Sequence, residues 1–157
     1  MPTIFCYRSL FAIGLLAVAP ALSAAPMKAG RGDCQLIVPA GWQDSNVIWD
    51  GACAAGTAHG QGVLRGYRQG GSTRLFFGEM KRGGLSLGVV EVDGGFIAGE
   101  FKGGVAVSNP ERSILIKAFA AGSAAAKAMG QRLKLAKKAE SSAFYLNKAQ
   151  ELEQQLD

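Results

Sequence analysis

Glycines recur at a fixed spacing between large apolar residues in three parts of the chain. The pattern is large apolar, any residue, glycine, any residue, large apolar, any two residues, glycine, and its copies begin at Trp49, Phe76 and Ile97. A glycine between two large side chains of one strand face leaves room for a neighbouring ring to lie across it. The second glycine suits the positive φ of a tight hairpin turn. We therefore expect three stacked β-hairpins, with the large residues as their core.

A return strand should follow the pattern in each hairpin. Residues 60–64 and 84–90 place glycines ahead of a β-branched or leucine pair, as such a strand requires. The expected units cover about residues 49–65, 76–92 and 97–107. The expected core and turn positions of these units are Trp49, Gly51, Gly56, Gly60, Gly62, Phe76, Gly78, Met80, Gly83, Ile97, Gly99, Phe101 and Gly104.

The arrangement resembles the MORN repeat, whose units run aromatic-x-Gly-x-aromatic-x-x-Gly and continue through glycines into an apolar strand. The family's usual Gly-Glu-aromatic motif is matched at residues 78–79 (Gly-Glu) and 99–102 (Gly-Glu-Phe-Lys). The first copy resembles the form of the repeat found in exported bacterial proteins. The resemblance covers about residues 47–105. The second copy lacks the family's Gly-x-Gly ending and the third loses its apolar tail. The resemblance implies a non-enzymatic scaffold or a membrane-proximal module.

The first 24 residues have the organisation of an export signal. Arg8 is their only charged residue, an apolar run covers residues 10–22, and small residues precede Pro26. The run is shorter than the roughly 20 residues that a membrane span needs, although a retained anchor is the alternative. We expect cleavage after Ala24 and a location in the periplasm or outside the cell.

Two cysteines, Cys34 and Cys53, stay in the mature chain. An oxidising compartment favours a disulfide between them, and closing that loop would stabilise the fold by about 3 kcal/mol. Free structural thiols are the alternative. A zinc site is disfavoured because only His59 could join the two thiolates, whereas structural zinc usually takes four ligands. We expect no metal and no cofactor.

The amino-acid composition changes in the C-terminal part of the chain. Residues 113–119 are apolar and partly β-branched, which predicts one more strand and completes a β-repeat domain over residues 25–121. Residues 122–157 contain no proline and are rich in Ala, Lys, Leu, Glu and Gln, which predicts one long, coiled-coil-like helix with Ser123 as its cap. At 1.5 Å per residue it would be roughly 50 Å long. The expected fold is α+β: antiparallel twisted hairpins followed by this helix.

Two sets of residues are candidates for a binding surface. Phe77 and Phe96 have the opposite strand parity from the repeat core, so we expect them to form an exposed aromatic surface for a protein partner. Lys134, Lys137 and Lys138 are expected on one helix face, which would meet an anionic membrane surface or would simply be solvated.

Small residues at Gly122, Ala126 and Gly130 share one face of the expected helix. Such a stripe permits close approach of another element. It either docks onto the rest of the chain, which we prefer, or joins two copies into a homo-oligomer.

The charge and the polar residues narrow the function. A formal net charge of +5 permits an acidic partner or anionic lipid, and no basic–aromatic interleaving indicates nucleic acid. His59 has no evident nucleophile or base partner. Glu79 and Glu100 occupy equivalent repeat positions, which indicates a solvated stripe rather than a glycosidase pair. The leading interpretation is a non-catalytic exported interaction module; the alternatives are a peripheral binder of anionic envelope lipid or polymer and, more distantly, a small hydrolase.

Overall fold

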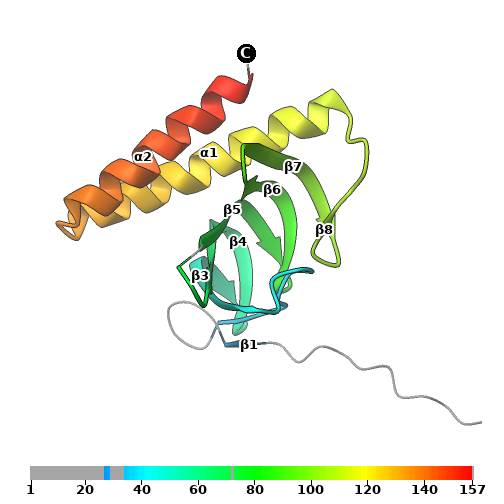
Figure 1. Cartoon of the computed structure of the whole chain (residues 1–157), viewed down its shortest axis with the longest axis horizontal. Coiled ribbons are helices and arrows are strands. Elements are labelled where there is room, and N and C mark those ends of the chain that lie inside the picture. Colours follow the sequence, from blue (N-terminus) through cyan, green and yellow to red (C-terminus); the bar gives the residue numbers. More distant parts are fainter. Residues whose placement is uncertain (1–26, 29–33, 72, 157) are drawn as a thin grey trace, which may run out of the picture.

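The computed structural model describes residues 27–28, 34–71 and 73–156 (Figure 1). The expected export signal over residues 1–24 lies outside the described residues. Eight strands form a curled, mixed β-sheet, and two helices follow, so the expected α+β class is confirmed. The elements are β1 (Met27–Lys28), β2 (Gln35–Leu36), β3 (Ser45–Ala54), β4 (Thr57–Arg68), β5 (Thr73–Lys81), β6 (Gly84–Val92), β7 (Gly95–Lys102), β8 (Val105–Ala106), α1 (Arg112–Leu135), α2 (Ala139–Glu153) and the 3₁₀ helix η1 (Gln154–Leu156).

Each copy of the glycine pattern begins in the first strand of a hairpin and ends in the turn that follows. The copies begin in β3, β5 and β7, and the return strands are β4, β6 and β8. Each of the three turns has two consecutive residues with positive φ, as in a type I′ turn. These residues are Ala55 (48°) and Gly56 (73°), Arg82 (50°) and Gly83 (79°), and Gly103 (59°) and Gly104 (80°). The final glycine of each copy is therefore a turn residue, and Gly56 lies exposed rather than in the core.

The central glycines of the hairpins form a row across five strands. Gly51 pairs with Gly62, Gly62 with Gly78, Gly78 with Gly88, and Gly88 with Gly99. No side chain separates the neighbouring backbones along this row, so large side chains from adjacent positions can cover it.

Two aromatic rings lie across the glycine row. A Cβ atom on Gly62 would lie 2.7 Å from the ring of Trp49 and 2.5 Å from the Cα of Gly51. A Cβ atom on Gly88 would lie 2.9 Å from the ring of Phe76. Both rings are fully buried, at 1% and 0% exposure, as the spacing predicts.

The third copy departs from this pattern. Ile97 occupies the position of Trp49 and Phe76 but is 45% exposed, so its assignment to the core is wrong. The return strand β8 has only two residues and pairs with Phe101 and Lys102. No further strand therefore extends the sheet beside Ile97 among the described residues, whereas Phe101 itself is buried against Phe76.

Residues 34–42, which we call the strap, close the inner face of the sheet, the face that carries the two rings. The strap crosses the turns of all three hairpins in order. The N–H of Gln35 donates to the carbonyl of Gly56 and that of Ile37 to the carbonyl of Gly83, both at 2.8 Å. A Cβ atom on Gly104 would lie 2.6 Å from the backbone nitrogen of Ala40. The strap also supplies three buried side chains to the inner core, Cys34, Leu36 and Trp42.

The expected disulfide between Cys34 and Cys53 is confirmed. The two Cα atoms are 5.8 Å apart, within the range that a disulfide spans. The bond ties the first residue of the strap to the end of β3.

Residues 113–119 are helical, so the expected strand there is wrong. They belong to the first turns of α1. Along the whole of α1, buried residues recur about every three or four positions, as on one face of a helix. These positions are Ala118, Gly122, Ser123, Ala125, Ala126, Met129, Gly130 and Leu133. Ser123 is therefore a mid-helix residue and not a cap; its hydroxyl lies 3.0 Å from a carboxylate oxygen of Glu153.

The expected single helix over residues 122–157 is also wrong, because the chain reverses between α1 and α2. The N–H of Lys138 donates to the carbonyl of Leu133, and that of Lys137 to the carbonyl of Lys134, each at 3.0 Å. This is the Schellman pattern of a helix end. Lys137 takes the left-handed position, with φ of 56°, that glycine usually occupies. Figure 1 shows α2 running back along α1.

The stripe of small residues receives elements of the same chain, in agreement with the docking interpretation. A Cβ atom on Gly130 would lie 2.8 Å from the side chain of Leu146 in α2. On Gly122 it would lie 3.4 Å from Leu152 of α2 and 3.1 Å from Val89 of the sheet. Helix α1 thus packs against both α2 and the outer face of the sheet, and residues of both helices join a second hydrophobic core on that face.

Candidate interaction site

The expected aromatic surface does not form. Phe77 is 0% exposed and Phe96 is half-buried, so the interpretation of both as an exposed binding surface is wrong. The outer face on which they lie is covered by the helices. Phe77 packs edge-on against Tyr145 of α2, with ring centroids 6.3 Å apart, and Phe96 packs edge-on against Phe119 of α1 at 6.2 Å.

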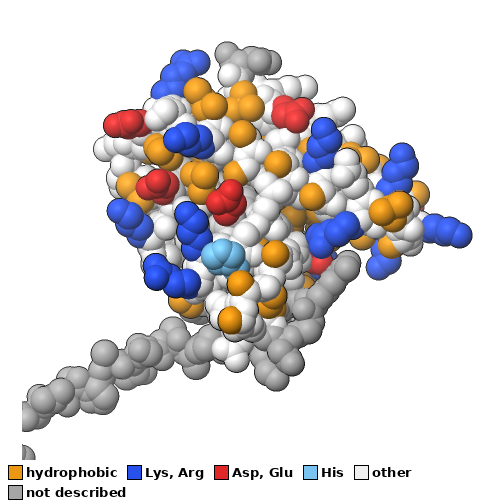
Figure 2. Space-filling model, turned by 180° about the vertical axis from the view of Figure 1, so that it is seen from behind, with side chains coloured by type: hydrophobic (Ala, Val, Ile, Leu, Met, Phe, Trp, Pro, Cys, Tyr) orange, Lys and Arg blue, Asp and Glu red, His pale blue; other side chains and the backbone are white. Residues whose placement is uncertain are grey.

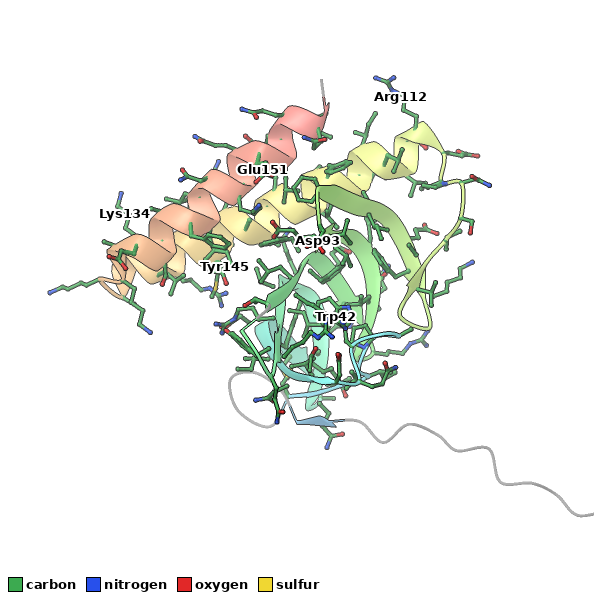
Figure 3. All side chains as sticks on the ribbon, in the orientation of Figure 1. Trp42, Asp93, Arg112, Lys134, Tyr145 and Glu151 are labelled. Atoms are coloured by element: carbon green, nitrogen blue, oxygen red, sulfur yellow. A yellow bond between two sulfur atoms is a disulfide. The ribbon has the colours of Figure 1, made fainter. Side chains whose placement is uncertain are left out.

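The expected lysines do come together, at the turn between the helices rather than along one helix face. Residues 134–138, which we call the helical tip, are all exposed. Figure 3 labels Lys134 at this end of the helices, which extends beyond the sheet. Seen from behind in Figure 2, Lys and Arg side chains surround the projecting end. In residues 127–140 the cationic residues are Lys127, Arg132, Lys134, Lys137 and Lys138, against one carboxylate, Glu140.

A cleft of about 630 Å³ lies beneath the helical tip, between β3 and β4 on one side and the two helices on the other. Within it Arg65 forms an ion pair with Asp50, whose side chain is only 7% exposed, and donates to the hydroxyl of Tyr67 at 2.7 Å. Burial opposes the charge of Arg65, but the carboxylate of Asp50 together with the nearby Tyr145 and Tyr67 raises the pKa of the guanidinium. Arg132 of α1 donates to the backbone carbonyl of Asp50 at 3.1 Å. The Arg132 hydrogen bond attaches helix α1 to strand β3, whereas the contacts of Arg65 lie within the sheet.

Two ionisable residues of α2 face the sheet. Burial raises the pKa of Tyr145, which Figure 3 shows between α2 and the sheet. Lys148 bonds to carboxylates of Glu91, at 2.8 Å, and Glu151, at 2.6 Å. Burial opposes its charge, but these hydrogen bonds prevail and raise the pKa of Lys148. Its ammonium also lies 5.5 Å from the centroid of the Phe96 ring, which helps to cover that ring.

A groove of about 780 Å³ opens on the inner face, between the strap and strands β6 to β8. Trp42 and Phe101 are buried at its walls. Val92, Ile97 and Val105 also line it and are 40%, 45% and 58% exposed. The charged residues at the groove are Arg68, Arg74, Glu91 and Asp93.

Among the described residues, no hydrogen bond or ion pair joins the residues considered for catalysis. His59 is exposed on β4. Glu79 and Glu100 are both placed opposite Leu87, which lies on the strand between theirs, so two strand spacings of about 4.8 Å separate their backbones. In the described part of the chain, no group of three or more His, Cys, Asp or Glu residues could hold a metal ion.

The sequence indicated the tip lysines but not the roles of Arg132, which joins α1 to β3, or of the ion pair between Asp50 and Arg65. Within the described ranges, no helix combines the length and the apolar character needed to cross a membrane. In comparisons with family models, curated proteins and solved structures, the chain has no match.

Proposed function

We propose that the protein is a non-catalytic, exported module that attaches to an anionic surface of the cell envelope through its helical tip. The observation that carries the proposal is the exposed lysine cluster Lys134, Lys137 and Lys138 at the projecting turn. The turn is held by the Schellman hydrogen bonds and by the contacts of Arg132 with strand β3. It therefore presents the charges on a defined frame.

The charge pattern supports this proposal. Among the described residues, no ion pair joins any of the three tip lysines to a carboxylate, whereas Lys148 and Arg65 are paired within the fold. Glu140, the one carboxylate within residues 127–140, lines the cleft that faces the sheet, as does Lys138, whereas Lys134 and Lys137 are not among the residues that line it. The Cys34–Cys53 disulfide is compatible with export, and the MORN-like spacing is compatible with a membrane-proximal role.

The expected strength follows from the number of lysines. Each lysine near an anionic bilayer contributes about 1 kcal/mol, so three contribute about 3 kcal/mol, or about 100-fold in affinity. Such an attachment is reversible and weakens as salt screens the charges.

The test is cosedimentation of the mature chain with vesicles of phosphatidylcholine containing 30% phosphatidylglycerol. Reversal of the three tip lysines (Lys134→Glu, Lys137→Glu, Lys138→Glu) should reduce binding by about 100-fold or more. The matched control reverses the charges of three exposed cations at the β5–β6 and β7–β8 turns, by replacing Lys81, Arg82 and Lys102 with Glu. It changes the net charge equally and should bind nearly as well as the natural chain. Equal loss in both triple variants would show that net charge, not the tip, controls binding.

A second candidate function is recognition of a protein partner at the inner-face groove. The observation that favours it is the clustering of three exposed apolar side chains, Val92, Ile97 and Val105, around one groove. Apolar surface gathered in a concave site is typical of binding sites.

The two functions can be distinguished by salt and by position. A photo-crosslinker at Ile97 should capture one defined protein from the envelope at high salt, and Val105→Glu should prevent that capture. A crosslinking yield that is unchanged by Val105→Glu would argue against partner binding at the groove.

A further inference from the structure

An apolar side chain lies exposed at the helical tip. Leu135, the last residue of α1, is 86% exposed, more than any other exposed large hydrophobic residue described. It lies between Lys134 and Lys137 in the sequence, and the backbone on both sides of it is fixed by hydrogen bonds. The N–H groups of residues 136, 137 and 138 each donate to a carbonyl of α1 at 3.0 Å.

We infer that Leu135 inserts into the interfacial layer of a lipid bilayer, so that the anionic surface bound by the tip is a membrane and not a polymer. This inference rests on the proposed function and specifies its ligand. The lysines would bind anionic headgroups while Leu135 enters the boundary between headgroups and acyl chains. Long lysine stems allow this arrangement, because their ammonium groups stay at headgroup level beside a deeper apolar side chain.

The combination of charge and apolar exposure favours a bilayer over an anionic polymer. A polymer would attract the lysines equally but would offer Leu135 no apolar phase. Burying a leucine fully is worth about 10- to 100-fold in affinity, and partial insertion into an interface should give about 10-fold. The turn between the helices also projects beyond the sheet (Figure 1), so a flat surface can reach the tip without meeting the β-strands first.

The first test uses Leu135→Trp as a fluorescent reporter. The two native tryptophans, Trp42 and Trp49, are 6% and 1% exposed, so they report on the fold rather than on the tip. With vesicles containing 30% phosphatidylglycerol, the added emission should shift to the blue and brominated acyl chains should quench it. With dextran sulfate, at a concentration that saturates binding, the emission should stay that of a solvated tryptophan. Vesicle binding without a blue shift or quenching would overturn the inference.

The second test compares two apolar positions of the same helix. Leu135→Gln should weaken vesicle binding about 10-fold, while Ile116→Gln should leave it unchanged. Ile116 is 43% exposed and lies near the other end of α1, so it is a matched control for the loss of an apolar side chain. Thermal unfolding of both variants checks that the fold is intact.

The outcomes separate the inference from the function on which it rests. If Leu135→Gln binds as tightly as the natural chain and the tip-lysine reversal does not bind, insertion is refuted and charge attachment stands. If the natural chain binds neither vesicles nor dextran sulfate, attachment and insertion both fail. Loss of binding in both Leu135→Gln and the lysine reversal, with Ile116→Gln unaffected, would support the insertion.

Discussion

Replacing Gly62 by alanine tests whether a ring lying over the glycine row holds the sheet together. Gly62 lies in β4 between Gly51 and Gly78, and its φ is in the ordinary range, so an alanine there is not strained by its backbone conformation. The new methyl group would lie 2.5 Å from the Cα of Gly51 and 2.7 Å from the ring of Trp49. Both distances are below 3.0 Å, so β3 or the ring must move.

The magnitude follows from what has to move. Overpacking a core by one methyl group typically costs about 1–3 kcal/mol. The upper part of this range applies here, because one of the two contacts is with backbone that pairs with Gly62 itself. We therefore expect the free energy of unfolding to fall by about 3 kcal/mol and the melting temperature by about 10 °C. Urea titration followed by tryptophan fluorescence would measure the change.

Gly95→Ala is the matched control. Gly95 is also a strand residue with an ordinary φ, but a Cβ atom there would meet nothing within 4 Å. Its replacement should leave stability unchanged or raise it by about 0.4–1 kcal/mol, because alanine has less freedom in the unfolded chain. In a Trp49→Leu background, the penalty of Gly62→Ala should shrink. If Gly62→Ala and Gly95→Ala were equally stable, the reasoning about the glycine row would be refuted.

Three further predictions concern the disulfide, the outer core and the response to pH. Reducing the Cys34–Cys53 bond should lower the free energy of unfolding by about 3 kcal/mol in urea titrations with and without reductant; a loss below about 1 kcal/mol would show that packing alone holds the strap. Phe77→Ala should lower the free energy of unfolding by about 3–5 kcal/mol, because the side chain of Phe77 is fully buried. A loss of no more than about 0.5 kcal/mol, which is typical of surface sites, would contradict that burial. The folded state raises the pKa of Tyr145 and of Lys148 above their ordinary values of 10.0 and 10.5. Their protonated forms therefore stabilise the fold fully below about pH 10, and this contribution is lost as the pH rises through the raised values. Tyr145→Phe should flatten the fall in the urea midpoint above pH 10; an identical fall in this variant would show that Tyr145 does not contribute.

Local chemistry made the hairpins predictable from sequence. Gly83 and the other final glycines of the pattern provide the positive φ of each turn, and Gly62 and Gly88 leave room for the rings of Trp49 and Phe76. These requirements lie within a few residues of each other or across one pair of strands. The spacing therefore predicted the hairpins and four large residues of the inner core, Trp49, Phe76, Met80 and Phe101.

The outer face was not predictable from strand alternation alone. The alternation of side chains along β5 places Phe77 on the opposite face from the inner core. Whether this outer face is exposed to water depends on which other elements pack on it. The first turns of the covering helix α1 contain residues 113–119, whose β-branched side chains made this segment resemble a strand. The glycines of α1 at 122 and 130 fit side chains of the sheet and of α2. A sheet with large apolar residues on both faces requires such a cover. That signal was present in Val63, Phe77 and Val89.

The reversal between the helices was hidden for a different reason. Helix ends are usually recognised by glycine or proline, and here Lys137 takes the left-handed position instead. The ion pair of Asp50 and Arg65 depends on a register that the sequence does not reveal. A two-residue turn at residues 55–56 alone would place Asp50 opposite Gln61. An irregularity between Gly51 and Cys53 shifts the pairing, so that Asp50 lies opposite Val63 and is a diagonal neighbour of Arg65.

The strap gives the assembly of the sheet a direction. Its successive residues bond first to the turn of the β3–β4 hairpin, next to that of the β5–β6 hairpin, and then lie against Gly104 in the last turn. These docking sites lie progressively farther along the chain, so closing each loop costs more entropy than closing the one before. The Cys34–Cys53 bond spans 19 residues and holds the strap at the first hairpin. We therefore expect the second and third hairpins to dock onto the strap in chain order, with the contact at Gly104 forming last.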